Sequence, residues 1–259
     1  MSMLLVKVLL STLLVGAATL VQRRYGHRAS GFLVGLPITT APYLLIVALE
    51  HGSQFTVHSA QGVLQGQIAL VLFIVAYGHA PQTWPWWATL TSATGLCLLL
   101  TVLISTHLFP PLIVFSVLAT IWWAAIRTWP TTSTTANIQG QSVEQAAWEI
   151  PTRLLVTLTI LVGLTEIAPR LGATLAGGLA TLPVISLVLC GATHRRFGPT
   201  GPRQFLRGLL ISLPGSTAFS LSVALLAPVI NRYLALALAL GITLTVASWQ
   251  ARHLRFTKA

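Results

Sequence analysis

Residues 24–40 read RYGHRASGFLVGLPITT, and residues 170–186 read RLGATLAGGLATLPVIS. The two stretches share a spacing of arginine, glycine, leucine and proline, and every shared position is 146 residues apart. An internal repeat constrains the architecture of a chain before any other signal. The matched pairs are Arg24 and Arg170, Gly26 and Gly172, Gly31 and Gly177, Leu33 and Leu179, Leu36 and Leu182, Pro37 and Pro183, and Thr40 and Ser186.

The composition places this repeat in a membrane. Of the 259 residues, 54% are hydrophobic and only 7% are charged, with a mean hydropathy of +0.80. A soluble domain carries about 25% charged residues, so these charges are too few to solvate a surface. We therefore predict an all-α, polytopic transmembrane helical bundle that contacts the lipid bilayer. The net charge of +11 lies in short groups between apolar runs, which indicates cytoplasmic loops and not a nucleic-acid surface.

Apolar runs between charge and turn signals predict about nine membrane spans, because a helix needs about 20 residues to cross the hydrocarbon. The domain prediction is a first membrane repeat at 1–127 with five helices, a polar inside linker at 128–149, and a second repeat at 150–259 with four helices. The expected spans are 3–21, 31–49, 60–77, 87–105, 111–126, 151–167, 172–192, 205–227 and 229–249.

Nine spans divide the basic residues very unequally between the two sides. One side receives twelve of the fifteen, and the other receives Lys7, Arg170 and Arg232. Cytoplasmic loops carry the excess of lysine and arginine, so we expect an outside N-terminus and a cytoplasmic C-terminus in the inner membrane. The twelve are Arg23, Arg24, Arg28, Arg127, Arg153, Arg195, Arg196, Arg203, Arg207, Arg252, Arg255 and Lys258.

The two repeats are expected to be inverted. Five spans in the first half make the second half enter the membrane from the opposite side. The loop at Arg24 is then inside, whereas its counterpart at Arg170 is outside. The positive charge of the loops changes with this orientation, because Gln61 and Gln65 of the first repeat occupy the positions of Arg203 and Arg207 in the second. Related segments with opposite charge bias are what inverted repeats leave in a sequence.

Proline interrupts the second helix of each repeat. Proline removes a backbone donor and frees a carbonyl four residues earlier, and in a membrane that carbonyl must face protein or water. Matching interrupted spans in two inverted halves indicate the central site of a transporter. The predicted substrate pathway consists of Pro37, Thr39, Thr40, Pro42, Thr181, Pro183 and Ser186.

Small residues on the same two helices allow a close crossing, for which we single out Gly31, Gly35 and Gly177. The competing interpretation is that the prolines and small residues serve packing alone. A third break, beginning at Pro214, indicates either a gate or a simple kink.

Few ionisable residues fall inside the expected spans. Glu166 is a candidate for proton coupling, although its spacing from Arg170 also fits an interfacial ion pair. The histidines near the expected outer face match no established metal-ligand spacing, and no catalytic motif is present. We therefore expect no enzymatic activity, no metal and no cofactor.

The repeated motif, Arg-x-Gly followed by Gly-x-Leu-x-x-Leu-Pro and then Ser or Thr, resembles a family of bacterial polytopic inner-membrane proteins, distantly similar to the GlpM-like proteins. The resembling stretches are 24–40 and 170–186. The resemblance implies a bacterial inner membrane and a multi-span helical fold, and it implies no catalytic residue or substrate.

Two functions fit these patterns. The first is a small secondary transporter, permease or exporter of a small solute, with its pathway where the Pro37 and Pro183 helices meet. The second is a membrane scaffold or accessory subunit that transports nothing, in which the same residues only pack.

Overall fold

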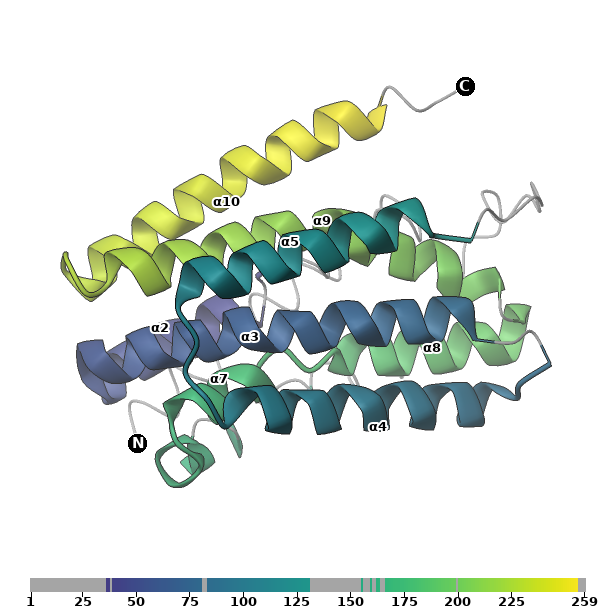
Figure 1. Ribbon diagram of the computed structural model, residues 1–259, viewed down its shortest axis with the longest axis horizontal. Helices are drawn as coiled ribbons and strands as arrows, with labels where there is room; N and C mark the ends of the chain where they lie inside the picture. The colour runs from purple at the N-terminus through teal and green to yellow at the C-terminus, as the bar shows by residue number, and fades with distance from the viewer. Residues whose placement is uncertain are drawn as a thin grey trace.

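The computed structural model describes residues 36, 37, 39–80, 83–130, 155, 159, 162–163, 166–198 and 200–255. Every regular element among these residues is a helix (Figure 1), which confirms the all-α prediction. The expected first span, Gly31 and Gly35 lie outside the described residues, as do most of the expected linker and most of the span at 151–167.

The first half contains α2 (Thr40–Glu50), α3 (Gly52–His79), α4 (Trp86–Ser105) and α5 (Pro111–Arg127). The bounds of α4 and α5 agree with the sequence prediction to within one residue at each end, and residues 106–110 separate the two helices. Helix α3 begins at Gly52 and not at residue 60. Gly52 adopts φ +84°, a conformation that favours glycine, and this turn folds α2 back along α3.

The second half contains α7 (Ala173–Leu179), α8 (Val184–Phe197), α9 (Thr200–Leu226) and α10 (Arg232–Arg255). The expected span at 172–192 is therefore two helices, separated by a non-helical segment that ends at Pro183. Among the described residues, four helical segments are long and apolar enough to cross a membrane, whereas α2 and α5 are shorter apolar helices. This set is compatible with a multi-pass integral membrane protein. The four are Gly52–His79, Trp86–Ser105, Pro202–Leu226 and Arg232–Gln250.

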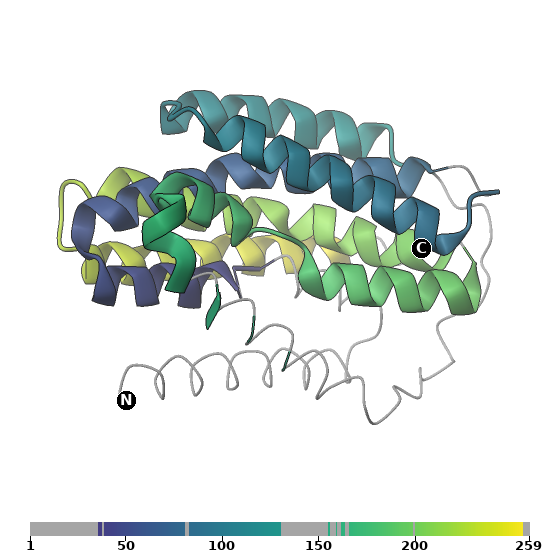
Figure 2. The same cartoon turned by 90° about the horizontal axis from the view of Figure 1, so that it is seen from below.

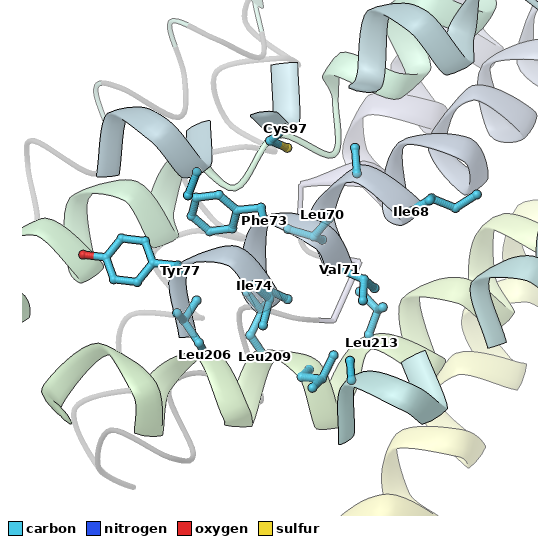
Figure 3. Close-up of a cluster of buried hydrophobic side chains, with 14 of the residues drawn as sticks. Ile68, Leu70, Val71, Phe73, Ile74, Tyr77, Cys97, Leu206, Leu209 and Leu213 are labelled. Carbon is cyan, nitrogen blue, oxygen red and sulfur yellow. The ribbon is translucent and has the colours of Figure 1, made fainter. Parts of the chain in front are cut away.

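Helices α3 and α9 pack antiparallel at the centre of the bundle. The hydroxyl of Ser53 donates to the carbonyl of Ala227 at one end, over 3.1 Å. At the other end, Nε of Arg203 donates to the carbonyl of Gly78 over 2.9 Å. Between these points the apolar side chains of the two helices interdigitate (Figure 3), so this pair is the axis on which the other helices pack. The side chains concerned include Val71, Ile74, Leu206, Leu209 and Leu213.

Most of the described arginines lie at one end of the bundle, where α3, α5, α8 and α10 end and α9 begins (Figure 1). We call this the basic end. The far end holds the turn between α2 and α3 and the turn between α9 and α10, with Glu50 and Arg232. The arginines of these helix termini are therefore grouped as the sequence predicts. At the basic end they are Arg127, Arg195, Arg196, Arg203, Arg207, Arg252 and Arg255.

Buried apolar residues form two separate cores. The basic-side core runs from Leu64 to Tyr77 on α3 and from Phe205 to Leu213 on α9, with residues of α4, α5 and α8. The far-side core contains buried residues of α2, the first part of α3, the last part of α9 and the first part of α10. Its chief members are Tyr43, Leu44, Ile46, Val47, Ala60, Val63, Ala176, Phe219, Val223, Ala235 and Ala239.

Candidate functional site

A buried polar layer separates the two cores. Nε2 of Gln67 donates to the hydroxyl oxygen of Ser216 over 3.1 Å, and the hydroxyl of Thr217 donates to Oε1 of Gln67 over 2.9 Å. These groups join the middle of α3 to the middle of α9, and all three side chains are at least nine-tenths buried. The polar layer consists of Gln65, Gly66, Gln67, Pro214, Gly215, Ser216 and Thr217.

Both interrupted segments reach this layer. Cδ2 of Leu36 lies 3.5 Å from the place where a Cβ on Gly215 would stand. A Cβ on Gly66 would overlap the hydroxyl oxygen of Thr181. From the middle of the bundle, α2 runs to the far end and α8 runs to the basic end (Figures 1 and 2). The sequence repeat therefore brings two helix beginnings to one polar region.

The break before α8 satisfies its own backbone. The N–H groups of Thr181 and Leu182 donate to the carbonyls of Gly178 and Leu179, each over 3.1 Å. The hydroxyl of Thr181 also donates to the Gly178 carbonyl, over 2.7 Å. Pro183 would leave the Leu179 carbonyl without its helical donor, and the tighter turn supplies Leu182 instead. Thr181, a predicted substrate-pathway residue, therefore donates its hydroxyl to its own turn.

The break before α2 lies at Pro37. The Pro37 carbonyl accepts the N–H of Ala41 over 2.9 Å, and Thr39 precedes the first helical residue, Thr40. Pro42, which was expected to interrupt the span, lies in the first turn of α2. The backbone N–H of a first-turn residue has no acceptor within the helix. Pro42, which lacks this N–H, therefore fits in the first turn of α2 without breaking the helix.

Thr40 and Ser186, which are equivalent in the sequence repeat, both have buried hydroxyls with no hydrogen-bond partner. Several buried hydroxyls in the described helices fold back onto a carbonyl of the preceding turn, as Thr101 does to Cys97 over 2.8 Å. A first-turn residue after a break has no such carbonyl in place. Buried polar groups normally have a partner, so this matched pair is the most unusual feature of the site.

Other unpartnered buried polar atoms lie near the layer or toward the far end. The amide oxygen of Gln65 is one of them, although its Nε2 donates to the carbonyl of His107 over 2.9 Å. The set includes the side-chain oxygens of Tyr43, Ser59, Gln61 and Ser105.

Gly177 makes a close helix crossing, and its partner is α3. A Cβ on Gly177 would overlap the carbonyl of Ser59, and a Cβ on Gly62 would overlap the carbonyl of Thr174. Helices α2 and α8 do not form an extensive interface with each other in the described part of the chain; α2 packs on α3, and α8 packs on α9. The sequence predicted that the two interrupted helices pack on each other; instead, each of them packs on the central pair of α3 and α9.

Helix α9 continues through Pro214, and side chains of two other helices bond to carbonyls of the turn that precedes the proline. Proline at 214 leaves the carbonyl of Leu210 without its helical donor, and Nε1 of Trp122 donates to that carbonyl over 2.7 Å. Nε2 of Gln250 donates to the neighbouring Ile211 carbonyl over 2.9 Å. Sequence reasoning missed Trp122 and Gln250. The sequence signal that could have identified them is a side chain with a hydrogen-bond donor on each of two otherwise apolar helices, α5 and α10.

At the basic end, polar side chains are paired. The hydroxyl of Tyr77 donates to the Cys190 carbonyl over 3.3 Å and lies 3.1 Å from Nδ1 of His194. Burial, followed by the nearby Arg203 guanidinium, lowers the pKa of His194 below its ordinary value. Arg203 holds the end of α3 through its bond to Gly78. These contacts close the bundle on this side.

Glu166 does not enter the polar layer. It is exposed in a helical stretch at 166–171 and makes an interaction of its own. Among the described residues, no group of three or more His, Cys, Asp or Glu side chains could hold a metal ion. Comparison with protein-family models, curated proteins and solved structures gives no match. The polar layer is therefore the feature of the described residues from which function is inferred.

Proposed function

We propose that this chain is a small secondary transporter, a permease or exporter, of the bacterial inner membrane, with the polar layer as its central solute site. The observation that carries the proposal is the matched pair of buried, unpartnered hydroxyls on Thr40 and Ser186. Each follows a proline break, and both helices begin near the same layer. Discontinuous helices of this kind form the solute sites of inverted-repeat transporters.

The packing pattern supports the inverted-repeat part of the proposal. Helices α3 and α9 are related by the spacing Leu64-x-Gly66 and Leu206-x-Gly208, and they pack antiparallel. The contact of α2 with α3 corresponds to that of α8 with α9, and the contact of α3 with α4 corresponds to that of α9 with α10. The contact of α2 with α10 likewise corresponds to that of α8 with α4. A two-fold axis in the membrane plane would exchange the members of each pair.

In this proposal the basic end is cytoplasmic, the N-terminus is outside and the C-terminus is inside. The unpartnered oxygens of Gln61 and Ser105 lie between the layer and the far end, whereas Tyr77 and Arg203 are paired toward the basic end. Polar groups that lack protein partners favour entry of water and solute. The solute therefore enters from the outer side in this conformation.

Cysteine accessibility tests the proposal. Thr40→Cys and Ser186→Cys should react with a membrane-impermeant thiol reagent, faster from the outside than from the inside. Cys97 and Cys190 are buried, so the parent chain gives the background, and Ser212→Cys in the packed core is the matched control. Protection of both positions from both sides would reject the transporter and favour the scaffold.

A growth assay tests transport directly. Overexpression and deletion should shift resistance to members of a panel of amphipathic compounds in opposite directions. The Thr40→Ala, Ser186→Ala double variant should behave as the deletion does while reaching the membrane at normal levels.

A further inference from the structure

Two helices begin beside the polar layer and point away from it. Helix α2 has 11 residues and α8 has 14, and they run to opposite ends of the bundle (Figures 1 and 2). The N-terminus of a helix carries about half a positive charge. Both positive ends therefore face the middle of the protein. In the first turn of α2 the N–H groups of Ala41 and Tyr43 already donate to the carbonyls of Pro37 and Thr39. Pro42 has no N–H, so free donors there must come from side chains.

The hydroxyls in these first turns supply an independent sign of a ligand. The side chain of Thr40 is 5% exposed and that of Ser186 is 1% exposed, and neither hydroxyl has a partner. A hydroxyl can donate a hydrogen bond to an anion, as the first N–H groups of a helix can. Two helix beginnings thus carry matching donors that the protein leaves unused.

Within the described residues, no carboxylate neutralises this positive potential. Neither α2 nor α8 has an acidic residue in its first turn. Glu50 ends α2 at the far end of the bundle, and Glu166 is exposed. The layer itself contains only glutamine, glycine, proline, serine and threonine. Lysine and arginine are also absent from the layer, so the two helix ends are its main source of positive potential.

We propose that the polar layer binds one small monovalent anion between the first turn of α2 and the first turn of α8, with the hydroxyls of Thr40 and Ser186 as donors. Two half-charges balance about one negative charge. A divalent anion would leave a buried charge uncompensated, which is costly. The inference names the substrate class of the proposed transporter and depends on that function for its meaning, although binding is measurable without transport.

Binding is tested on the purified full chain in detergent, with chloride as the probe and gluconate as the bulky control anion at constant sodium and ionic strength. Chloride should raise the unfolding temperature by about 3 °C or more at concentrations well above its Kd, and the rise should grow with the logarithm of the chloride concentration. Thr40→Val with Ser186→Ala should abolish this rise. Thr56→Val with Ser212→Ala should retain it, because those hydroxyls bond to their own helices.

An equal rise in gluconate, or an unchanged rise in the Thr40 and Ser186 variant, would overturn the anion site. If that variant does not fold, the single-cysteine variants give the second measurement. Chloride should slow thiol modification at Thr40→Cys and Ser186→Cys at least several-fold relative to gluconate. No difference between the two anions would be equally decisive against the site.

Flux into proteoliposomes separates the two proposals. Saturable chloride flux that the double variant lacks supports both. Saturable glycerol or potassium flux with no chloride flux would leave a transporter and overturn the anion. Chloride-dependent stabilisation with no flux of any tested solute would support the anion site and contradict the transporter.

Discussion

The two cores of the bundle are both apolar, but they differ in how their polar groups are satisfied. In the basic-side core, Tyr77 contacts Cys190 and His194 across two helices. In the far-side core, the buried hydroxyls of Tyr43 and Ser59 face each other without a hydrogen bond of good geometry. A buried polar group that lacks a good partner is costly. The buried hydroxyls of the basic side are therefore better satisfied than those of the far side.

The two sides also pack by different means. On the far side, α3 and α7 approach through glycine, because Gly62 and Gly177 leave room for facing carbonyls. On the basic side, aromatic side chains such as Phe73 and Tyr77 fill the space between helices. Close backbone contact depends on small residues, so the far side tolerates added volume least.

The largest expected effect follows from that contact. Gly62→Ala should destabilise the protein by about 1–3 kcal/mol, because the new Cβ overlaps the Thr174 carbonyl and the backbones must separate. Thermal unfolding of the detergent-purified chain measures this loss. Gly95→Ala on α4 is the control, since a Cβ there meets nothing within 4 Å. Equal stability of the two variants would mean that α3 and α7 are not in close contact.

The side-chain donor that compensates for Pro214 gives the next largest effect. Trp122→Phe should cost about 1–3 kcal/mol, because the Leu210 carbonyl loses its donor in a buried position. Pro214→Ala restores a backbone N–H, so Trp122→Phe should cost less in that background. A double-mutant cycle of unfolding free energies measures the coupling. Trp123→Phe, at an exposed position, should be nearly neutral, and an additive cycle would disprove the compensation.

The stability of the folded protein should depend on pH through His194, which lies on the basic side. The folded state holds the pKa of His194 below its ordinary value of about 6.5, so the unfolded chain binds the proton more readily. Stability should therefore be full above about pH 6.5 and decrease as the pH falls below it. Unfolding temperatures between pH 8 and pH 5 test this. His194→Gln should flatten the profile, whereas His107→Gln should leave it unchanged.

The smallest stability effect is expected in the polar layer. Gln67→Leu combined with Ser216→Ala should change the unfolding free energy by less than about 1 kcal/mol, since replacing both partners of a buried hydrogen bond by apolar groups can be nearly neutral. Thr217 retains its bond to the Leu213 carbonyl. Solute flux should nevertheless fall at least tenfold. A large loss of stability with normal flux would assign Gln67 to packing alone.

Sequence patterns predicted helices α4 and α5 almost to the residue, because hydropathy and proline turns are local signals. They also singled out Thr40 and Ser186 as a pair, through the repeat. The prediction that the two interrupted helices meet each other was less successful, because sequence spacing carries no information about which neighbour a glycine face contacts. Ser59 and Thr174 supply the carbonyls that those faces approach.

The amino-acid sequence by itself determined the helical class, the 146-residue repeat, the positions of two proline breaks and the grouping of arginines at one end of the helices. Only the tertiary structure decided which freed carbonyl accepts which donor. Trp122 and Leu210 are 88 residues apart, and Gln67 and Ser216 are 149 apart. Hydrogen bonds over such separations depend on how helices pack, and that packing sets which buried hydroxyls stay unpartnered.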